Sequence, residues 1–192
     1  MGQYYRPILT NNANGNERVY NRHVDGEYTG AKLMEHSWWE NEFVGTICSK
    51  LFKKPMKVAW VGDYADDAET TNGIEKTDLI RLCKKAWDKG KGYGVKKKVL
   101  LLDGLFLVNH TKKIYVDCSE YKEKSIMKDG WCIHPLPLLT ALGNGLGGGD
   151  YNYPSADSDA QAVGSWANDT ISIEKGIPDG YEKVSYVFKE GE

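Results

Sequence analysis

The distribution of apolar and polar positions predicts extended structure at the start of the chain. Residues 4–9 have the composition of a strand, residues 11–16 form a polar cluster typical of a turn, and residues 18–21 resume an extended pattern. Two extended segments joined by a short polar turn indicate a β-hairpin. Further along, residues 58–61 are continuously apolar. This run predicts a short strand that is buried on both faces.

A helical period follows the hairpin. Apolar residues recur every four positions from Trp39 to Leu51, which predicts one broad apolar stripe on a helix. Ser37 and Glu40 have the spacing of a capping box, in which each side chain bonds to the backbone N–H at the other's position. Pro55 is expected to end the helix.

The remaining pattern predicts a second main helix and several short strands. Residues 72–75 can cap this helix, whose apolar face includes Leu79 and Cys83 and which ends at Gly90. Residues 135–139 are expected to begin a short helix with proline in its first turn. A three-stranded meander is expected at residues 99–102, 105–109 and 114–116, with its first turn at Asp103-Gly104. A final strand is expected at residues 184–188.

This order of elements fits an α+β fold better than a regular alternation of strands and helices. We expect a single domain over residues 1–192, with a mixed or mainly antiparallel sheet, two main helices and a glycine-rich loop. The length agrees, because one domain typically takes about 150 residues.

Charge and composition restrict the partners. The 25 basic and 27 acidic residues give a net charge of −2, so overall charge does not favour nucleic acid or an anionic membrane as a partner. No apolar stretch approaches the roughly 20 residues of a membrane-spanning helix, and the first residues lack the apolar core of a secretory signal. The four cysteines form no CxxC pair and are expected to be reduced. We therefore expect a cytoplasmic protein.

The glycine-rich loop, residues 143–149, is the first candidate binding element. It contains G-x-G-x-x-G but lacks the flanking strand and helix of a dinucleotide site. Consecutive backbone N–H groups can still receive an anion. The alternative is a surface loop with no ligand. The candidate ligand-binding residues here are Asn144, Gly145, Gly147, Gly148 and Asp150.

An acidic loop follows the apolar strand at residues 58–61. Asp63, Asp66 and Asp67 could hold a divalent cation through oxygen ligands, or one of them could serve as a general base. The alternative is a solvated loop whose carboxylates cap the next helix. A divalent cation is the one cofactor that the sequence suggests.

Four further candidates lie among apolar residues. His36 and His134 could transfer protons, although histidine in such surroundings is often a hydrogen-bonded core residue. Trp38 and Trp166 could stack on a ligand ring. The chain has no HExxH zinc motif, no G-x-S-x-G elbow and no P-loop lysine motif, which argues against the enzyme classes that use them.

Several blocks of sequence together resemble an uncharacterised protein family of bacterial genomes and bacteriophages. They are MGQYY at the start, LMEHSW at 33–38, WVGDYAD at 60–66, VNHTKK at 108–113, HPLPLLT at 134–140 with the glycine loop, and VGSWA at 163–167. The resemblance implies a single domain and an intracellular setting, in bacteria or an infected host cell. It carries over no activity, substrate or catalytic residue.

Three functions remain open on these grounds. The first is binding of a small anionic or nucleotide-like ligand at the glycine-rich loop. The second is a protein-binding inhibitor or adaptor of a phage or mobile element, with aromatic residues as interface anchors. The third is a metal-assisted hydrolase that uses the loop at residues 63–67, with His36 or His134 transferring protons. Whether the protein is an enzyme stays open.

Overall fold

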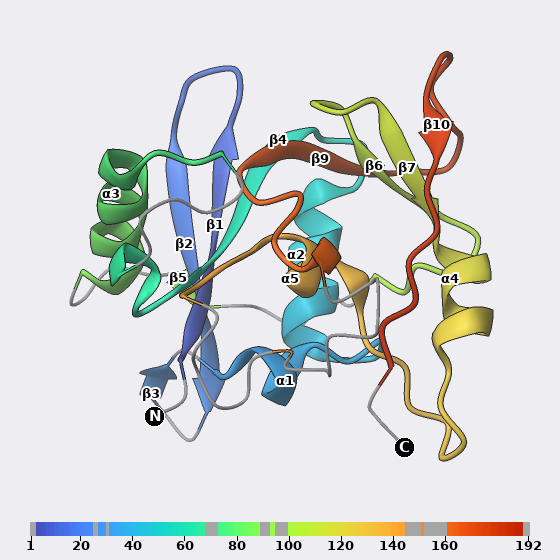
Figure 1. The fold of residues 1–192 in the computed structure, drawn as a ribbon, viewed down its shortest axis with the longest axis horizontal. Helices are drawn as coiled ribbons and strands as arrows, with labels where there is room; N and C mark the ends of the chain where they lie inside the picture. Colours follow the sequence, from blue (N-terminus) through green and yellow to red (C-terminus); the bar gives the residue numbers. More distant parts are fainter. Residues whose placement is uncertain are drawn as a thin grey trace.

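One mixed sheet organises the molecule (Figure 1). The computed structural model describes residues 3–24, 27–29, 31–67, 73–88, 93–94, 100–144, 151 and 161–189. The strands are β1 (Tyr5–Asn11), β2 (Glu17–Val24), β3 (Glu27–Thr29), β4 (Met56–Gly62), β5 (Tyr93–Gly94), β6 (Phe106–Asn109), β7 (Ile114–Asp117), β8 (Ala141–Leu142), β9 (Asp169–Glu174) and β10 (Glu182–Lys183). The helices are α1 (Leu33–His36), α2 (Glu42–Leu51), α3 (Lys76–Trp87), α4 (Cys118–Ser125) and α5 (Pro135–Leu139), with a short 3₁₀ turn η1 (Ala65–Asp67).

The sheet runs in the order β10-β7-β6-β9-β4-β1-β2-β3. β9 and β8 share one edge of β4, at opposite ends of that strand, and β5 pairs with β2. Three pairs, β10 with β7, β5 with β2 and β8 with β4, are parallel, and the other pairs are antiparallel. This arrangement confirms the α+β class with a mainly antiparallel mixed sheet.

β4 separates two apolar cores. Successive side chains of a strand point to opposite faces of the sheet. Val58 and Trp60 accordingly join the core that includes α2 and α5, whereas Ala59 and Val61 join the core under α3. The four side chains are at most 2% exposed, which confirms the prediction of a strand buried on both faces. In Figure 1, α2 and α5 cross the centre of the sheet and α3 lies beside β1 and β2.

The start of α2 differs from the prediction. The expected capping box between Ser37 and Glu40 is absent, because the Ser37 hydroxyl donates to the carbonyl of Leu33 at 2.6 Å in the preceding helix. Asn41 caps α2 instead, its side chain accepting from the N–H groups of Phe43 and Val44. Residues 37–41 therefore form a turn between α1 and α2, although the apolar stripe of α2 continues to Leu51 as expected.

The predicted three-stranded meander is wrong in its first strand. In the part of the chain that the structure describes, residues 100–102 form no strand, and Gly104, at φ +72°, closes a turn in which Leu105 N–H donates to the carbonyl of Leu102. Only the second hairpin, β6 with β7, forms. The other neighbour of β6 is β9, a central strand that the sequence prediction missed.

The predicted final strand, residues 184–188, is also wrong. Ladder pairing is limited to β10, and the chain beyond it has no strand pairing among the described residues. Its alternation reflects packing, because Phe188 is fully buried and its neighbour in space, Tyr186, stacks nearly parallel to it.

The other expected elements are present. β1 and β2 form the predicted hairpin, and α5 begins with Pro135 as predicted. α3 begins after Glu75, which makes no side-chain cap. It ends at Trp87, with Asp88 already extended, and so stops short of the end predicted at Gly90. None of the helices described here is both long and apolar enough to cross a membrane.

Candidate functional site

The three aspartates of the acidic loop have separate surroundings. Asp63 accepts the N–H of Tyr4 at 3.1 Å, and burial raises the pKa of its carboxyl. The carboxyl of Asp66 lies 3.4 Å from the Cys83 sulfur, and Asp67 is exposed. Among the residues that the structure describes, no three His, Cys, Asp or Glu side chains are grouped to hold a metal ion. The described geometry therefore gives no support to a cation site here.

The described end of the glycine-rich loop is closely packed. The Gln3 amide donates to the Asn144 side chain and accepts from its N–H. A Cβ atom at Gly143 would lie 2.8 Å from Gln3 Oε1 and would clash with the Tyr5 hydroxyl. A Cβ at Gly62 would clash with the same Gln3 oxygen. Close packing thus accounts for glycine at position 143. The other candidates of this loop, Gly145, Gly147, Gly148 and Asp150, lie outside the described residues.

His36 and Trp166 both lie in the interior. Trp60 Nε1 donates to His36 Nε2 at 2.7 Å, so the ring carries its proton on Nδ1 and donates to the carbonyl of Lys32, also at 2.7 Å. Both ring nitrogens are thus used in holding the fold together. Trp166 is fully buried and donates to the Tyr186 hydroxyl. Neither side chain has a surface on which a ligand could bind.

His134 is a capping residue. Its Nδ1 accepts the N–H of Leu136 at the start of α5, so Nε2 carries the proton and faces the Cys48 sulfur at 3.5 Å. Burial lowers the pKa of His134 to about 3 and raises that of Cys48 well above its ordinary value. A neutral imidazole beside a neutral thiol, both at most 1% exposed, is not an activated nucleophile.

His110 belongs to a hydrogen-bonded chain that sequence reasoning missed. The Ser172 hydroxyl donates to Glu174 at 2.7 Å, so His110 Nε2, 2.7 Å away, donates to Ser172, and Nδ1 accepts from Tyr181. The histidine therefore does not act as a base toward the serine, whose side chain is fully buried. The partners lie more than 60 residues from His110, and no sequence motif connects them.

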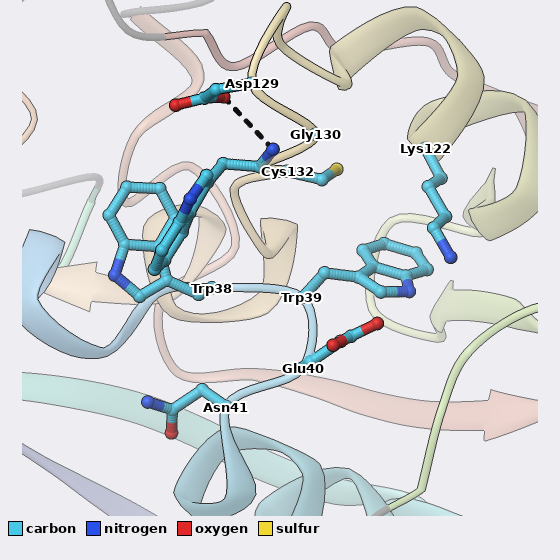
Figure 2. Close-up of a pocket in the computed structure, with 9 residues that line it drawn as sticks. Trp38, Trp39, Glu40, Asn41, Lys122, Asp129, Gly130 and Cys132 are labelled. Carbon is cyan, nitrogen blue, oxygen red and sulfur yellow. Dashed lines mark hydrogen bonds between the residues drawn. The ribbon is translucent and has the colours of Figure 1, made fainter.

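A cavity of about 390 Å³ lies between the α1–α2 turn and the chain that follows α4 (Figure 2). This volume is within the range of small-molecule sites. We call the cavity the Trp cleft, and it is lined by Trp38, Trp39, Glu40, Asn41, Lys122, Asp129, Gly130, Trp131 and Cys132.

Tryptophans form the two sides of the Trp cleft. On one side, Trp38 and Trp131 meet edge to face, with ring centroids 4.5 Å apart. Trp131 is 51% exposed, the largest value among the exposed hydrophobic side chains described. On the other side, Trp39 is buried and stacks on Tyr121, their rings inclined by 13°. Figure 2 shows the side chains of Trp38 and Trp39 on opposite sides of the opening.

Backbone hydrogen bonds hold the two segments of the cleft together. The Trp39 N–H donates to the carbonyl of Cys132 at 2.9 Å, and the His134 N–H donates to the carbonyl of Ser37 at 2.7 Å. The break between α1 and α2 at residues 37–41 leaves the Trp39 N–H and the Ser37 carbonyl available for these bonds. In a continuous helix, both groups would form hydrogen bonds within the helix. The cleft is therefore built into the frame of the fold.

Lys122 lies against the Trp39 wall. Its ammonium is 5.4 Å from the centre of the indole ring, within cation–π range. The same ammonium binds Asp103 at 2.9 Å and is the main cause of the lowered pKa of that carboxyl. The positive charge that lines the cleft is thus already paired with a carboxylate.

Two carboxylates complete the lining. Asp129 accepts the N–H of Trp131 at 3.2 Å, which fixes its position in the turn, as the dashed line in Figure 2 shows. Glu40 is exposed and makes no hydrogen bond or ion pair with another described residue. Cys132 is buried, and desolvation raises its pKa to about 11, so it stays a neutral thiol at neutral pH. The lining therefore offers aromatic faces and negative charge.

Sequence reasoning identified Trp38 but not the residues that face it. One local signal was present, because Asp129-Gly130 is typical of a turn and places Trp131 at its exit. The rest of the lining comes from segments about 90 residues apart, so only the fold brings them together.

Comparison with protein-family models, with curated proteins and with solved structures finds no match. Function is therefore inferred from the geometry of the chain itself.

Proposed function

We propose that the protein binds a small organic cation, one with a planar or aromatic group, in the Trp cleft. The observation that carries this proposal is the half-exposed Trp131, held edge-on against Trp38 at a cavity whose far wall is Trp39. Indole faces are the strongest aromatic binders of cations, and ligand pockets combine apolar walls with a few fixed polar groups.

The charges support a cation rather than the anionic ligand expected from the sequence. Glu40 and Asp129 line the cleft, and the one lysine of the lining is engaged by Asp103. An anion would meet two carboxylates, whereas a cation would gain from both of them and from the indoles. The protein-binding and hydrolase functions stay predictions.

Calorimetric titration with three probes of one ring shape tests the proposal. The probes are 1-methylnicotinamide, a cation, nicotinamide, which is neutral, and nicotinate, an anion. The cation should bind at least about tenfold more tightly than nicotinamide, a difference of ~1.4 kcal/mol, and nicotinate should bind most weakly.

Variants locate the site. Trp131→Ala should abolish cation binding, and Glu40→Gln with Asp129→Asn should narrow the difference in affinity between the cation and the neutral probe, leaving the part that the indoles contribute. Ile177→Ala, which removes another exposed apolar side chain away from the cleft lining, is the matched control and should bind as the wild type does. No binding of any probe, tighter binding of nicotinate, or unchanged binding by Trp131→Ala would contradict the proposal.

A further inference from the structure

One positive charge already lies at the Trp cleft, and it belongs to the chain itself. The Lys122 ammonium lies over the Trp39 ring, 5.4 Å from its centre, and binds the Asp103 carboxylate at 2.9 Å. Figure 2 shows the Lys122 side chain extending from α4 to the Trp39 ring. An indole ring with a carboxylate beside it attracts a cation through two separate interactions. Trp39 and Asp103 therefore have the chemistry of a cation subsite.

The two partners of the ammonium are fixed by other parts of the fold. The Trp39 N–H donates to a carbonyl of the chain that follows α4, at 2.9 Å. Asp103 lies in a turn whose Gly104 N–H donates to the Ser119 hydroxyl at 2.8 Å, which fastens the turn to the start of α4. Shortening the side chain of Lys122 should therefore leave the indole in place and the carboxylate on the same turn.

The Lys122 ammonium occupies a position that Trp39 could otherwise offer to a ligand. The Trp39 side chain is only 5% exposed, and the rings of Tyr121 and His134 also lie against it. Trp131, in the opposite side of the cleft, is 51% exposed. A ligand cation can therefore reach the Trp131 indole, whereas at Trp39 it has to compete with the positive charge of Lys122.

We propose that Trp39 and Asp103 form a second cation subsite of the Trp cleft, which Lys122 fills, and that Lys122 thereby lowers the affinity of the cleft for other cations. The effect on affinity rests on the proposed function, whereas the subsite is a property of the chain alone. Once Lys122 is removed, the subsite should take a primary alkylammonium ion, because this is the group that it holds in the wild type.

Filling the subsite from solution tests the proposal. Lys122→Ala removes the atoms of one n-propylammonium ion, so this ion is the matched probe, and 1-propanol has the same length without the charge. In a ¹⁵N-labelled sample, propylammonium should shift the Trp39 indole signal of Lys122→Ala saturably. Its affinity should be at least about tenfold higher than that of 1-propanol for the same variant, and than that of propylammonium for the wild type.

The variant is expected to fold. The Lys122–Asp103 pair is partly exposed, with 31% and 51% of the two side chains accessible, and exposed ion pairs contribute little to stability. Alanine is also the best helix former, which suits a position within α4.

Two further variants separate the subsite from a general effect of charge. Lys122→Met removes the charge but keeps the length of the side chain, so it should bind propylammonium as weakly as the wild type does. Adding Asp103→Asn to Lys122→Ala removes the carboxylate and should weaken propylammonium binding at least about tenfold. Tight binding of propylammonium by Lys122→Met, or equal binding of propylammonium and 1-propanol by Lys122→Ala, would overturn the proposal.

Lys122→Met also tests the effect on the cleft. Its affinity for 1-methylnicotinamide should be at least about threefold higher than that of the wild type, because the internal positive charge is gone. Lys175→Gln, which removes an exposed lysine away from the cleft lining, is the control and should leave this affinity unchanged. An unchanged affinity in Lys122→Met, or an equal rise in Lys175→Gln, would overturn this part of the proposal.

The two proposals can fail separately. If the wild type binds 1-methylnicotinamide but Lys122→Ala binds propylammonium no better than the wild type does, the second subsite is refuted and the proposed function stands. If Lys122→Ala binds propylammonium but the wild type does not bind 1-methylnicotinamide, the subsite is supported and the proposed function is refuted.

Discussion

At the scale of single residues, burial decides what the histidines do. His134 lies in apolar surroundings, and the sequence left open whether it transfers protons or supports the core. Its Nδ1 caps α5 and its Nε2 faces a buried thiol, so both nitrogens are used in structure. The sequence could not decide between the two roles because Cys48 lies 86 residues away.

The pKa of His134 makes stability depend on pH. The pKa falls from an ordinary 6.5 to about 3 through burial, so only the unfolded chain gains this proton between those values. The folded state therefore loses stability as pH falls below 6.5, with a slope approaching about 1.4 kcal/mol per pH unit for this one group.

His134→Asn isolates this effect, because asparagine is a good N-cap and does not titrate. Urea unfolding of both proteins between pH 7 and 4 should show a shallower loss of stability in the variant. Identical slopes would mean that His134 is not the buried neutral histidine described here.

At the scale of elements, the turn between α1 and α2 shows what periodicity can and cannot predict. The four-residue apolar period correctly predicted the buried face of α2. The same period also placed Trp39 on the helix. Trp39 is buried in the turn, and its spacing from Phe43 is the same as the spacing between the buried residues of the helix. The capping asparagine, four residues after Ser37, sets the actual boundary and opens the Trp cleft.

Two substitutions test whether Asn41 or Ser37 caps the start of α2. Asn41→Ala removes the acceptor of two helix N–H groups and should destabilise the fold by about 1 kcal/mol. Ser37→Ala removes the hydroxyl that donates to the carbonyl of Leu33, but this carbonyl still accepts the hydrogen bond of the Ser37 N–H. This substitution should therefore lower the free energy of unfolding by less than Asn41→Ala does. Urea unfolding at neutral pH measures the loss of stability in each variant. A larger loss in Ser37→Ala than in Asn41→Ala would indicate that Ser37, and not Asn41, caps the helix.

At the scale of the whole molecule, the sequence predicted the class of the fold and missed its long-range pairings. β4 was correctly predicted because its apolar run is continuous, whereas β9 was missed and its partners, β6 and β4, lie far away along the chain. The same limit applies to function, since the two walls of the Trp cleft come from residues 38–41 and 122–132. Tertiary pairing creates the site, and no local motif encodes it.

The most direct test of the account follows the indole N–H signals of the six tryptophans in a ¹⁵N-labelled sample titrated with 1-methylnicotinamide. Trp38, Trp39 and Trp131 line the cleft. Trp60 and Trp166 are buried in the core, and Trp87, at the end of α3, packs against the guanidinium of Arg6. We predict saturable shifts of the first three signals and little change in the others. Shifts confined to Trp60, Trp87 or Trp166, or no saturable shift at all, would contradict the proposal that the Trp cleft binds an organic cation.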